Sequence, residues 1–562
     1  MEQLLKRAHE IVFSLEVDAS EPSSKDEISR LISSFENGTP TSPAEAESLP
    51  DTIAQLPQEI LVRIAELVKI PRELCGRQGF GDEEEEEDSD ASTRKREALS
   101  TSFKSLSTSL LKLSLPLLRL LPIPSSDARP DRETLSLRSA LFIAYSRFLQ
   151  PDFSSLFSNS TLYDLSSRLL KLILSPETLR LPLLSNLLRT SLPVYFKPHP
   201  KLNPSTGRLL NRPLGGPTNL GSDMGEDEAG WKREGGVSGT VLTVIQNLRI
   251  EELEEMWPWL LPPVLSFLDD YNTENKVLGL HLLDTLIEKL QEPTEQGGRS
   301  IGGSLLTRTG VGKVFEQSLT IIFSNLSDPL SVKLQSLSQP VSLKLINLLY
   351  PPPSPFPPSP SLSSSAPTLT LTEAEKERSR KRFEALCRHF TETIMTIWNY
   401  KSGYYSLELL VLSTPSRETG LVPWMQEMGR GVIRYLGILV PHLTGLLHTD
   451  ELAEGEKTTA SGRETLQLRL AAVKVLRELT RSDRAGRRIK GWEEEIVSAV
   501  GRCWVEIKEG EMGEPERELR DELERELKGL VRELKGIEAG KNQRDYWKEL
   551  KELDPIFEDL VA

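Results

Sequence analysis

Residues 251–290 contain two apolar-periodic segments joined by a short polar turn. They read EELEEMWPWLLPPVLSFLDDYNTENKVLGLHLLDTLIEKL. Apolar residues recur at spacings of three and four in both segments, which places them along one face of each predicted helix. The acidic pair Asp269 and Asp270, with Asn272 and Asn275, ends the first helix and can cap the second. The resulting hairpin has two apolar stripes and no core of its own, so it must stack on other hairpins.

Residues 431–479 supply a second, looser copy of this hairpin. Aligning Pro441 with Pro262 brings the apolar ends of the two first helices into register. A proline inside a helix removes a hydrogen bond and costs about 3 kcal/mol unless a kink is required, and HEAT repeats use such a kink. We therefore predict an all-α fold, a HEAT- or armadillo-like α-solenoid of stacked helical hairpins with long disordered loops.

Composition is consistent with a large helical protein. The 562 residues exceed a single core, and hydrophobic residues make up 38% but aromatic residues only 6%. The net charge of −15 argues against a nucleic-acid partner, because phosphate contacts need clustered Lys and Arg. Three separated cysteines fit a reducing compartment. We find no signal peptide and no uncharged run that could span a bilayer, so we expect a cytoplasmic and nuclear protein without membrane contacts.

Polar interruptions divide the chain into seven predicted regions. They are N-terminal helices (1–80), an acidic disordered loop (81–98), helical repeats (99–198), a Gly/Pro-rich loop (199–238), central HEAT-like repeats (239–350), a Pro/Ser-rich disordered insertion (351–370), and C-terminal HEAT-like repeats with a capping helix (371–562).

Three segments each have two interpretations. The acidic run 82–88 is a solvated loop or, with Ser89 beside it, a contact tuned by phosphorylation. The segment 351–367 contains PxxP patterns, among them Pro352 to Pro355 and Pro355 to Pro358, and is a disordered insertion or an SH3-type ligand. The apolar stripe of residues 519–537 belongs to a capping helix or to a helix that docks a partner.

A search for catalytic, metal and cofactor motifs yields none. The six histidines form no HExxH motif and lie near no cysteine pair, and GxSxG is absent. The glycines of residues 302–315 suggest a phosphate loop, but Val314 stands where Ser or Thr is required and position 307 is Thr instead of Gly. Thr309 as the cap of a helix starting near Val311 explains this segment better. We predict no cofactor and no metal.

Two segments, WPWLLPPVLSFLDDYNTENKVLGLHLLDTLIEKL and RTGVGKVFEQSLTIIFSNL, resemble the Tel-two-interacting protein two family. The family pattern is a Trp-Pro helix, a DD turn, a K-V-x-G helix and a T-G-x-G-x-V-F helix start. The residues at these positions are Trp257, Pro258, Asp269, Asp270, Lys276, Val277, Gly279, Thr309, Gly310, Gly312, Val314 and Phe315, with Pro262 inside the first helix. The rest of the C-terminal half is compatible in layout, and residues 1–240 match only in being helical.

The resemblance implies a non-enzymatic scaffold, the smallest subunit of the TTT co-chaperone complex. Its partners would be the two larger helical-repeat subunits and, indirectly, the heat-shock chaperone machinery and the phosphatidylinositol-kinase-related protein kinases that it matures. Telomere maintenance would depend on it indirectly. Aromatic density in the C-terminal repeats suggests Trp398, Tyr404, Tyr405 and Trp424 as partner-binding residues. Ordinary packing between helices is the alternative role for these four side chains.

Two other classes remain open. One is a HEAT-repeat adaptor of another pathway, such as a transport or phosphatase scaffold. The other is an enzyme whose site is assembled from scattered residues, which would require a deep pocket with convergent titratable groups.

Overall fold

The structure of this chain is a computed structural model. It describes residues 2–15, 22–38, 55–71, 74, 89–121, 130–150, 156–175, 177–210, 230–293, 301–352, 373–399, 420–447, 462–483, 488–509, 516–537 and 546–561. These residues form helices and connecting segments without any strand, and one isolated antiparallel bridge joins Leu202 to Leu209. The described chain divides into two compact units, Met1–Val311 and Gly312–Ala562. The all-α fold with hairpins stacked on hairpins, as predicted, is confirmed.

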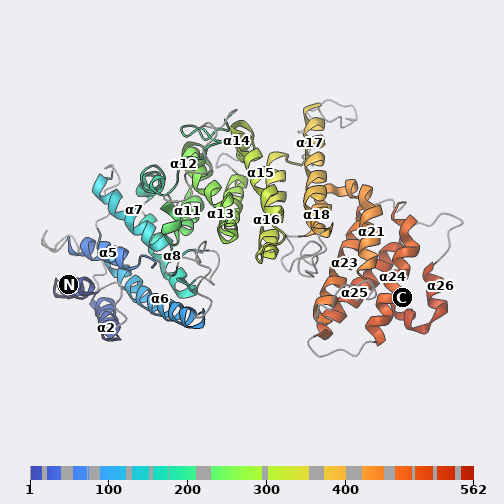
Figure 1. The fold of residues 1–562 in the computed structure, drawn as a ribbon, viewed down its shortest axis with the longest axis horizontal. Coiled ribbons are helices and arrows are strands. Elements are labelled where there is room, and N and C mark those ends of the chain that lie inside the picture. The colour runs from blue at the N-terminus through green and yellow to red at the C-terminus, as the bar shows by residue number, and fades with distance from the viewer. Residues whose placement is uncertain are drawn as a thin grey trace, which may run out of the picture. The chain divides into compact units, whose positions relative to one another are not determined.

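The first unit is built from helices that pack on their sequence neighbours and on the next pair along the chain (Figure 1). Its elements are α1 (Glu2–Ser14), α2 (Pro22–Gly38), α5 (Leu56–Leu67), α6 (Ser89–Arg119), α7 (Arg132–Ser146), α8 (Ser160–Leu174), α9 (Glu177–Asn186), the π-helix η3 (Leu187–Ser191), the 3-10 helix η4 (Leu192–Val194), α10 (Gly230–Arg233), α11 (Val237–Asn247), α12 (Ile250–Leu268), α13 (Thr273–Gln291) and α14 (Gly302–Thr309).

Stacking in the first unit follows a regular order. Helix α5 packs on α7, α7 on α11 and α11 on α13, which makes one row, while α6 packs on α8 beside it. Within each helix the buried residues recur every three or four positions. In α8, for example, Leu162, Leu165, Leu169 and Ile173 face the core, and Asn159 caps the start by accepting from the Leu162 N–H at 2.9 Å. Each hairpin therefore buries its apolar faces against its neighbours.

The second unit has one continuous hydrophobic core that contains Trp424, Leu476 and Trp504. Its elements are α15 (Val311–Phe323, which begins at the unit boundary), α16 (Ser331–Leu349), α17 (Glu373–His389), the π-helix η5 (Phe390–Ile394), α18 (Met395–Asn399), α20 (Leu421–Met428), the 3-10 helix η6 (Gly429–Tyr435), α21 (Leu436–Gly445), α23 (Gly462–Ser482), the 3-10 helix η7 (Ile489–Trp492), α24 (Glu493–Glu509), α25 (Arg517–Lys535), α26 (Tyr546–Leu553), the 3-10 helix η9 (Pro555–Phe557) and α27 (Glu558–Val561).

Two boundaries differ from the sequence-based expectation. Helix α6 begins at Ser89, inside the region 81–98 that we expected to be a loop. Residues 91–98 contain no glycine or proline and are rich in Ala, Arg, Lys and Glu, so the helix anchored by the buried residues from Phe103 onward extends back through them. Residues 230–238, expected to belong to the Gly/Pro-rich loop, contain α10 and the start of α11. The acidic run 82–88 and residues 353–372 lie outside the described residues.

Candidate functional site

The residues of the family pattern lie mainly in the α12–α13 hairpin. Trp257 is buried beneath the segment after η4, where a Cβ on Gly207 would lie only 2.9 Å from the Trp257 ring. Gly207 has φ +61°, so a residue without a side chain is required both by its backbone and by the ring below it. Pro258 and Pro262 lie inside α12, which runs without interruption from Ile250 to Leu268. Trp257 therefore fixes the connecting segment to the hairpin.

The two aspartates of the turn contact both described parts of the region 199–238, which are residues 199–210 and 230–238. Asp269 pairs with His199 (Nε2 to Oδ2, 3.2 Å), while Asp270 accepts from the Lys232 Nζ at 2.9 Å. Asp270 also accepts from the Asn275 side chain at 2.7 Å. Because the Asp270 carboxylate is almost fully buried, these two donors compensate for the loss of water. The pair therefore has a role beyond ending a helix, which the sequence did not indicate.

The start of α13 confirms the predicted cap and explains the glycine of the pattern. Asn272 caps α13 by accepting from the Glu274 N–H at 2.8 Å. A Cβ on Gly279 would lie 2.7 Å from the Leu268 nitrogen and 2.8 Å from the Phe267 carbonyl carbon. Only glycine permits this approach of the two helix backbones. Lys276, three residues before Gly279 in α13, is buried, with 7% of its surface exposed.

The remaining glycines of the pattern lie at a helix boundary. Gly310 ends α14 with φ +75°, and its neighbour Leu209 donates its N–H to the Thr309 carbonyl at 2.8 Å. The Thr309 hydroxyl donates back to the Leu305 carbonyl at 2.7 Å. The expectation that Thr309 caps the following helix is therefore wrong, because α14 was not foreseen and Thr309 is its last residue.

Three pattern residues, Gly312, Val314 and Phe315, lie in the second unit. Gly312 stands against α16, since a Cβ there would lie 2.8 Å from the Leu349 side chain. Phe315 in α15 is fully buried. Gly312 therefore permits the close approach of α15 to α16, while Val314 and Phe315 are buried core residues.

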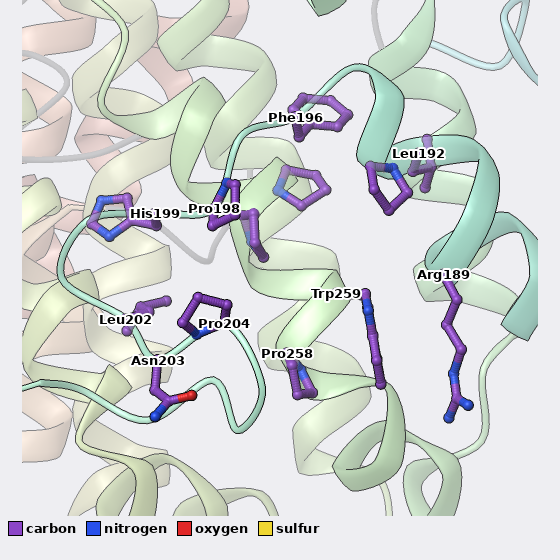
Figure 2. A pocket seen from close by; sticks show the side chains of 13 residues that line it. Arg189, Leu192, Phe196, Pro198, His199, Leu202, Asn203, Pro204, Pro258 and Trp259 are labelled. Atoms are coloured by element: carbon purple, nitrogen blue, oxygen red, sulfur yellow. The ribbon is translucent and has the colours of Figure 1, made fainter. Parts of the chain in front are cut away.

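A pocket of about 220 Å³ opens on the first unit between α12 and the chain from η3 to Pro204. Figure 2 shows Pro198 and Pro204 on one side of it and Pro258 and Trp259 on the other. Six prolines line it: Pro193, Pro198, Pro204, Pro258, Pro262 and Pro263.

Trp259 and Arg189 form one edge of this pocket (Figure 2). The Arg189 guanidinium carbon lies 4.5 Å from the centre of the Trp259 ring, and the guanidinium also pairs with Glu255 at 2.7 Å. A cation over an aromatic face is attractive and holds both groups in place. The ring of Trp259 is thus fixed while remaining partly exposed to the pocket.

A buried ion pair anchors the N-terminus of α12. Arg180 of α9 donates to both oxygens of Glu252, which also accepts from the Arg249 backbone N–H at 2.9 Å. Burial alone would raise the pKa of Glu252, but these hydrogen bonds and the Arg180 charge outweigh it and hold that pKa below its ordinary range. The carboxylate stays ionised and keeps α12 joined to α9.

The four aromatic residues predicted to bind a partner are placed only in part. Trp424 is 0% exposed, stacks on Phe390 at 4.7 Å and donates its indole N–H to the Leu386 carbonyl at 3.0 Å. In this structure it has the packing role that the sequence left as the alternative. Trp398 belongs to the described backbone of α18, but its side chain, like Tyr404 and Tyr405 as a whole, lies outside the described residues.

The pocket was not foreseen from the sequence. Trp259 and Asn203 are ordinary residues in a sequence scan, and Arg189 meets Trp259 only through the fold. The detectable signal was the pair Pro262-Pro263 at three and four residues after Trp259. The described residues contain no group of His, Cys, Asp and Glu side chains able to hold a metal ion. In the same part of the chain, no helix has the length and apolar character needed to cross a bilayer.

Comparison with models of known protein families matches residues 143–450 to the Tti2 family. No individually curated protein matches the chain. The matched stretch is longer than half of the 562 residues and contains the whole pattern from Trp257 to Phe315. This chain therefore belongs to the Tti2 family.

Proposed function

We propose that this chain is a non-enzymatic scaffold subunit of the TTT co-chaperone complex, which supports the maturation and stability of phosphatidylinositol-kinase-related protein kinases. Membership of the Tti2 family supports a role related to the TTT complex in general. The scaffold role, the two larger helical-repeat subunits as direct partners, and action in the cytoplasm and nucleus are the proposal.

The family match over residues 143–450 is the observation that carries this proposal. It spans α7 to α21 and so takes in hairpins of both units. Stacked hairpins leave long helix faces open along one side, which suits them to hold another helical-repeat protein. The pocket beside Trp259 adds an apolar, ring-lined recess with few polar groups, which suits binding better than acid–base catalysis.

Reconstitution with the two larger TTT subunits tests the proposal. The full-length chain, mixed with both, should elute with them as a single ternary species whose mass equals the sum of the three, measured by size-exclusion chromatography with light scattering. In cells, depletion of the chain should lower the amounts of several kinases of this family together. A chain that stays monomeric beside both subunits contradicts the proposal and leaves a HEAT-repeat adaptor of another pathway as the explanation.

The predicted partner-binding residues Trp398, Tyr404 and Tyr405 give a second test. Replacing Tyr404 and Tyr405 by Ala should weaken assembly of the ternary species while the far-ultraviolet circular dichroism spectrum stays unchanged. Tyr271→Ala, which alters an exposed tyrosine in the first unit, is the matched control and should assemble normally. Loss of helix signal in the double variant would instead assign the two tyrosines to packing.

A further inference from the structure

The pocket beside Trp259 is a preformed slot. Its outer wall is held by the turn that follows Pro198: the Asn203 side chain accepts from the Ser205 N–H at 2.9 Å, and its backbone carbonyl accepts from the Gly207 N–H at 2.8 Å. His199 ties the same wall to Asp269. The inner wall is α12 itself. Proline rings lose little conformational freedom when a ligand packs on them, so this slot binds at low entropic cost.

Two hydrogen-bond donors at the slot have no partner among the described residues. The Trp259 indole N–H is one, and the Asn203 amide N–H is the other, because Asn203 uses only its oxygen in the turn. Both residues line the pocket (Figure 2). The slot therefore offers donors to a ligand that presents carbonyl oxygens.

One carbonyl of α12 also lacks its usual helical partner. In an α-helix the carbonyl of a residue accepts from the N–H four positions later, or three positions later in a 3-10 turn. For Trp259 these positions are Pro263 and Pro262, and neither has an N–H. The Trp259 carbonyl points along the helix toward these two rings, which also line the pocket. The Trp259 carbonyl therefore has no N–H partner at either usual position of α12.

We propose that this slot binds a proline-rich segment of a partner protein in the polyproline II conformation, with at least one residue other than proline in it. Such a helix makes no internal hydrogen bonds, so its carbonyls are free to meet Trp259 and Asn203. Its proline rings pack on the face of an aromatic ring, as in other proline-recognition grooves. The N–H of its non-proline residue donates to the Trp259 carbonyl. The inference rests on the proposed scaffold function only in that the segment belongs to a partner.

Peptide binding to the full-length chain alone tests this, so its outcome is separate from that of the reconstitution above. The probe is a fluorescein-labelled decapeptide, APPLPPLPPA, measured by fluorescence anisotropy. We expect saturable binding that weakens at least about tenfold when every proline is replaced by glycine, because the flexible peptide must be ordered. Decaproline, which has no internal N–H to donate, should bind about threefold or more weaker than the probe.

Four variants locate the site. Trp259→Ala should weaken binding at least about tenfold and Trp259→Phe, which keeps a ring but loses the N–H, about threefold. Asn203→Asp keeps the oxygen that forms the turn but removes the amide donor, and should also weaken binding about threefold. Tyr271→Ala, an exposed ring on the same hairpin that does not line the slot, should leave affinity unchanged. If Trp259→Ala fails to fold by circular dichroism, the two conservative variants decide the matter.

Three results would overturn the proposal. Equal affinity for the proline and glycine peptides would make the slot a simple apolar anchor site. Unchanged binding in Trp259→Phe and Asn203→Asp would place the peptide elsewhere. Tighter binding of PPPSPFPPSP, the chain's own sequence at residues 351–360, together with concentration-dependent dimerisation, would make the occupant a second copy of this chain.

Discussion

The helix pairs α12–α13 and α21–α23 share an apolar pattern and a proline in the first helix, yet they form different interfaces. In the first pair only Asp269–Asn272 separates the two helices, and their backbones meet at Gly279. In the second pair α21 ends at Gly445 and α23 begins at Gly462, and α23 packs chiefly on α25. Close backbone contact joins α12 to α13, whereas ionic side chains link α23 to α25.

The ionic contacts of α23 show the contrast. Lys474 pairs with Glu522, and Arg477 pairs with both Glu526 and Glu533 of α25. Long side chains tolerate a shift of one helix past the other, whereas two backbones in contact do not. The same hydrophobic period therefore leaves open which neighbour a helix packs on, and the small or charged residues between the apolar positions decide it.

Gly279→Ala should have the largest effect. The added methyl group meets backbone atoms of Leu268 and Phe267 at under 3 Å, so the two helices must move apart, and we expect a loss of about 3 kcal/mol, the upper end for overpacked sites. Hydrogen exchange of peptides from α12 and α13 measures it locally. Gly501→Ala in α24 is the control, since its methyl group would meet Leu550 at an ordinary 3.4 Å. Equal exchange rates in Gly279→Ala and the native chain would show that the close backbone contact does not restrict residue 279 to glycine.

Lowering the pH should weaken the second unit at His389. This imidazole is buried against Phe323 with only the Ser342 and Thr393 hydroxyls at 3.4 Å, and burial lowers its pKa from 6.5 to about 4. Between these values the unfolded chain binds a proton that the folded chain does not, so stability falls as pH falls. From pH 7 to pH 5 the loss is about 2 kcal/mol.

The variant His389→Gln isolates this contribution. It should lose about 2 kcal/mol less than the native chain over the same pH interval, measured by hydrogen exchange in α16 and α17. The Arg180–Glu252 pair of the first unit supplies the contrast. Because the pKa of Glu252 is held below its ordinary value of 4.5, its contribution is fully present above that pH and is lost only as pH falls further. Parallel pH profiles in His389→Gln and the native chain would rule out His389 as the cause.

How far the sequence predicts this molecule depends on the kind of feature. The α12–α13 hairpin, its Asn272 cap and the start of α15 near Val311 were predictable, because periodicity and capping are local. The sequence identified Gly279 only as a residue of the family pattern. Physically, Gly279 lets two helix backbones touch. That contact depends on the angle between α12 and α13, which no local sequence pattern encodes.

The candidate site was harder to foresee. Asp269 and Asp270 were recognised as a turn, but their partners His199 and Lys232 lie far apart in sequence at the two ends of a region expected to be a loop. Trp424 attracted attention as an aromatic residue, although a tryptophan is used in a core as readily as on a binding surface. The slot requires α12 to meet the chain from η3 to Pro204, and only the pair Pro262-Pro263 pointed to it.

Arg477→Met should weaken the α23–α25 interface, with a smaller effect that depends on salt. The guanidinium lies over Gly529 and joins two carboxylates, Glu526 and Glu533, that are about one-quarter exposed or less. Its loss leaves Glu526 without this cation, while Glu533 keeps its pair with Arg481 at 2.8 Å. We expect a cost of about 1 to 2 kcal/mol at low salt. The cost should shrink in 1 M NaCl, where screening shortens the reach of charge to about 3 Å.

Thermal unfolding of Arg477→Met and the native chain at both salt concentrations gives the measurement. Arg380→Met in α17, which removes an exposed cation paired only within its own helix, is the matched control and should cost under about 0.5 kcal/mol. A salt-independent loss in Arg477→Met would assign this side chain to packing over Gly529 rather than to charge.

Gly437→Ala should have the smallest effect and the opposite sign from Gly279→Ala. Gly437 lies in α21, the counterpart of α12, and the nearest atom to an added methyl group would be in the Trp492 ring at 4.0 Å. With space available, the substitution removes only the conformational freedom of glycine in the unfolded chain, which favours the helix by about 0.5 to 1 kcal/mol. A small rise in the unfolding temperature is the expected result. A fall would mean that α21 makes a close backbone contact after all, and the two hairpins would then be joined in the same way.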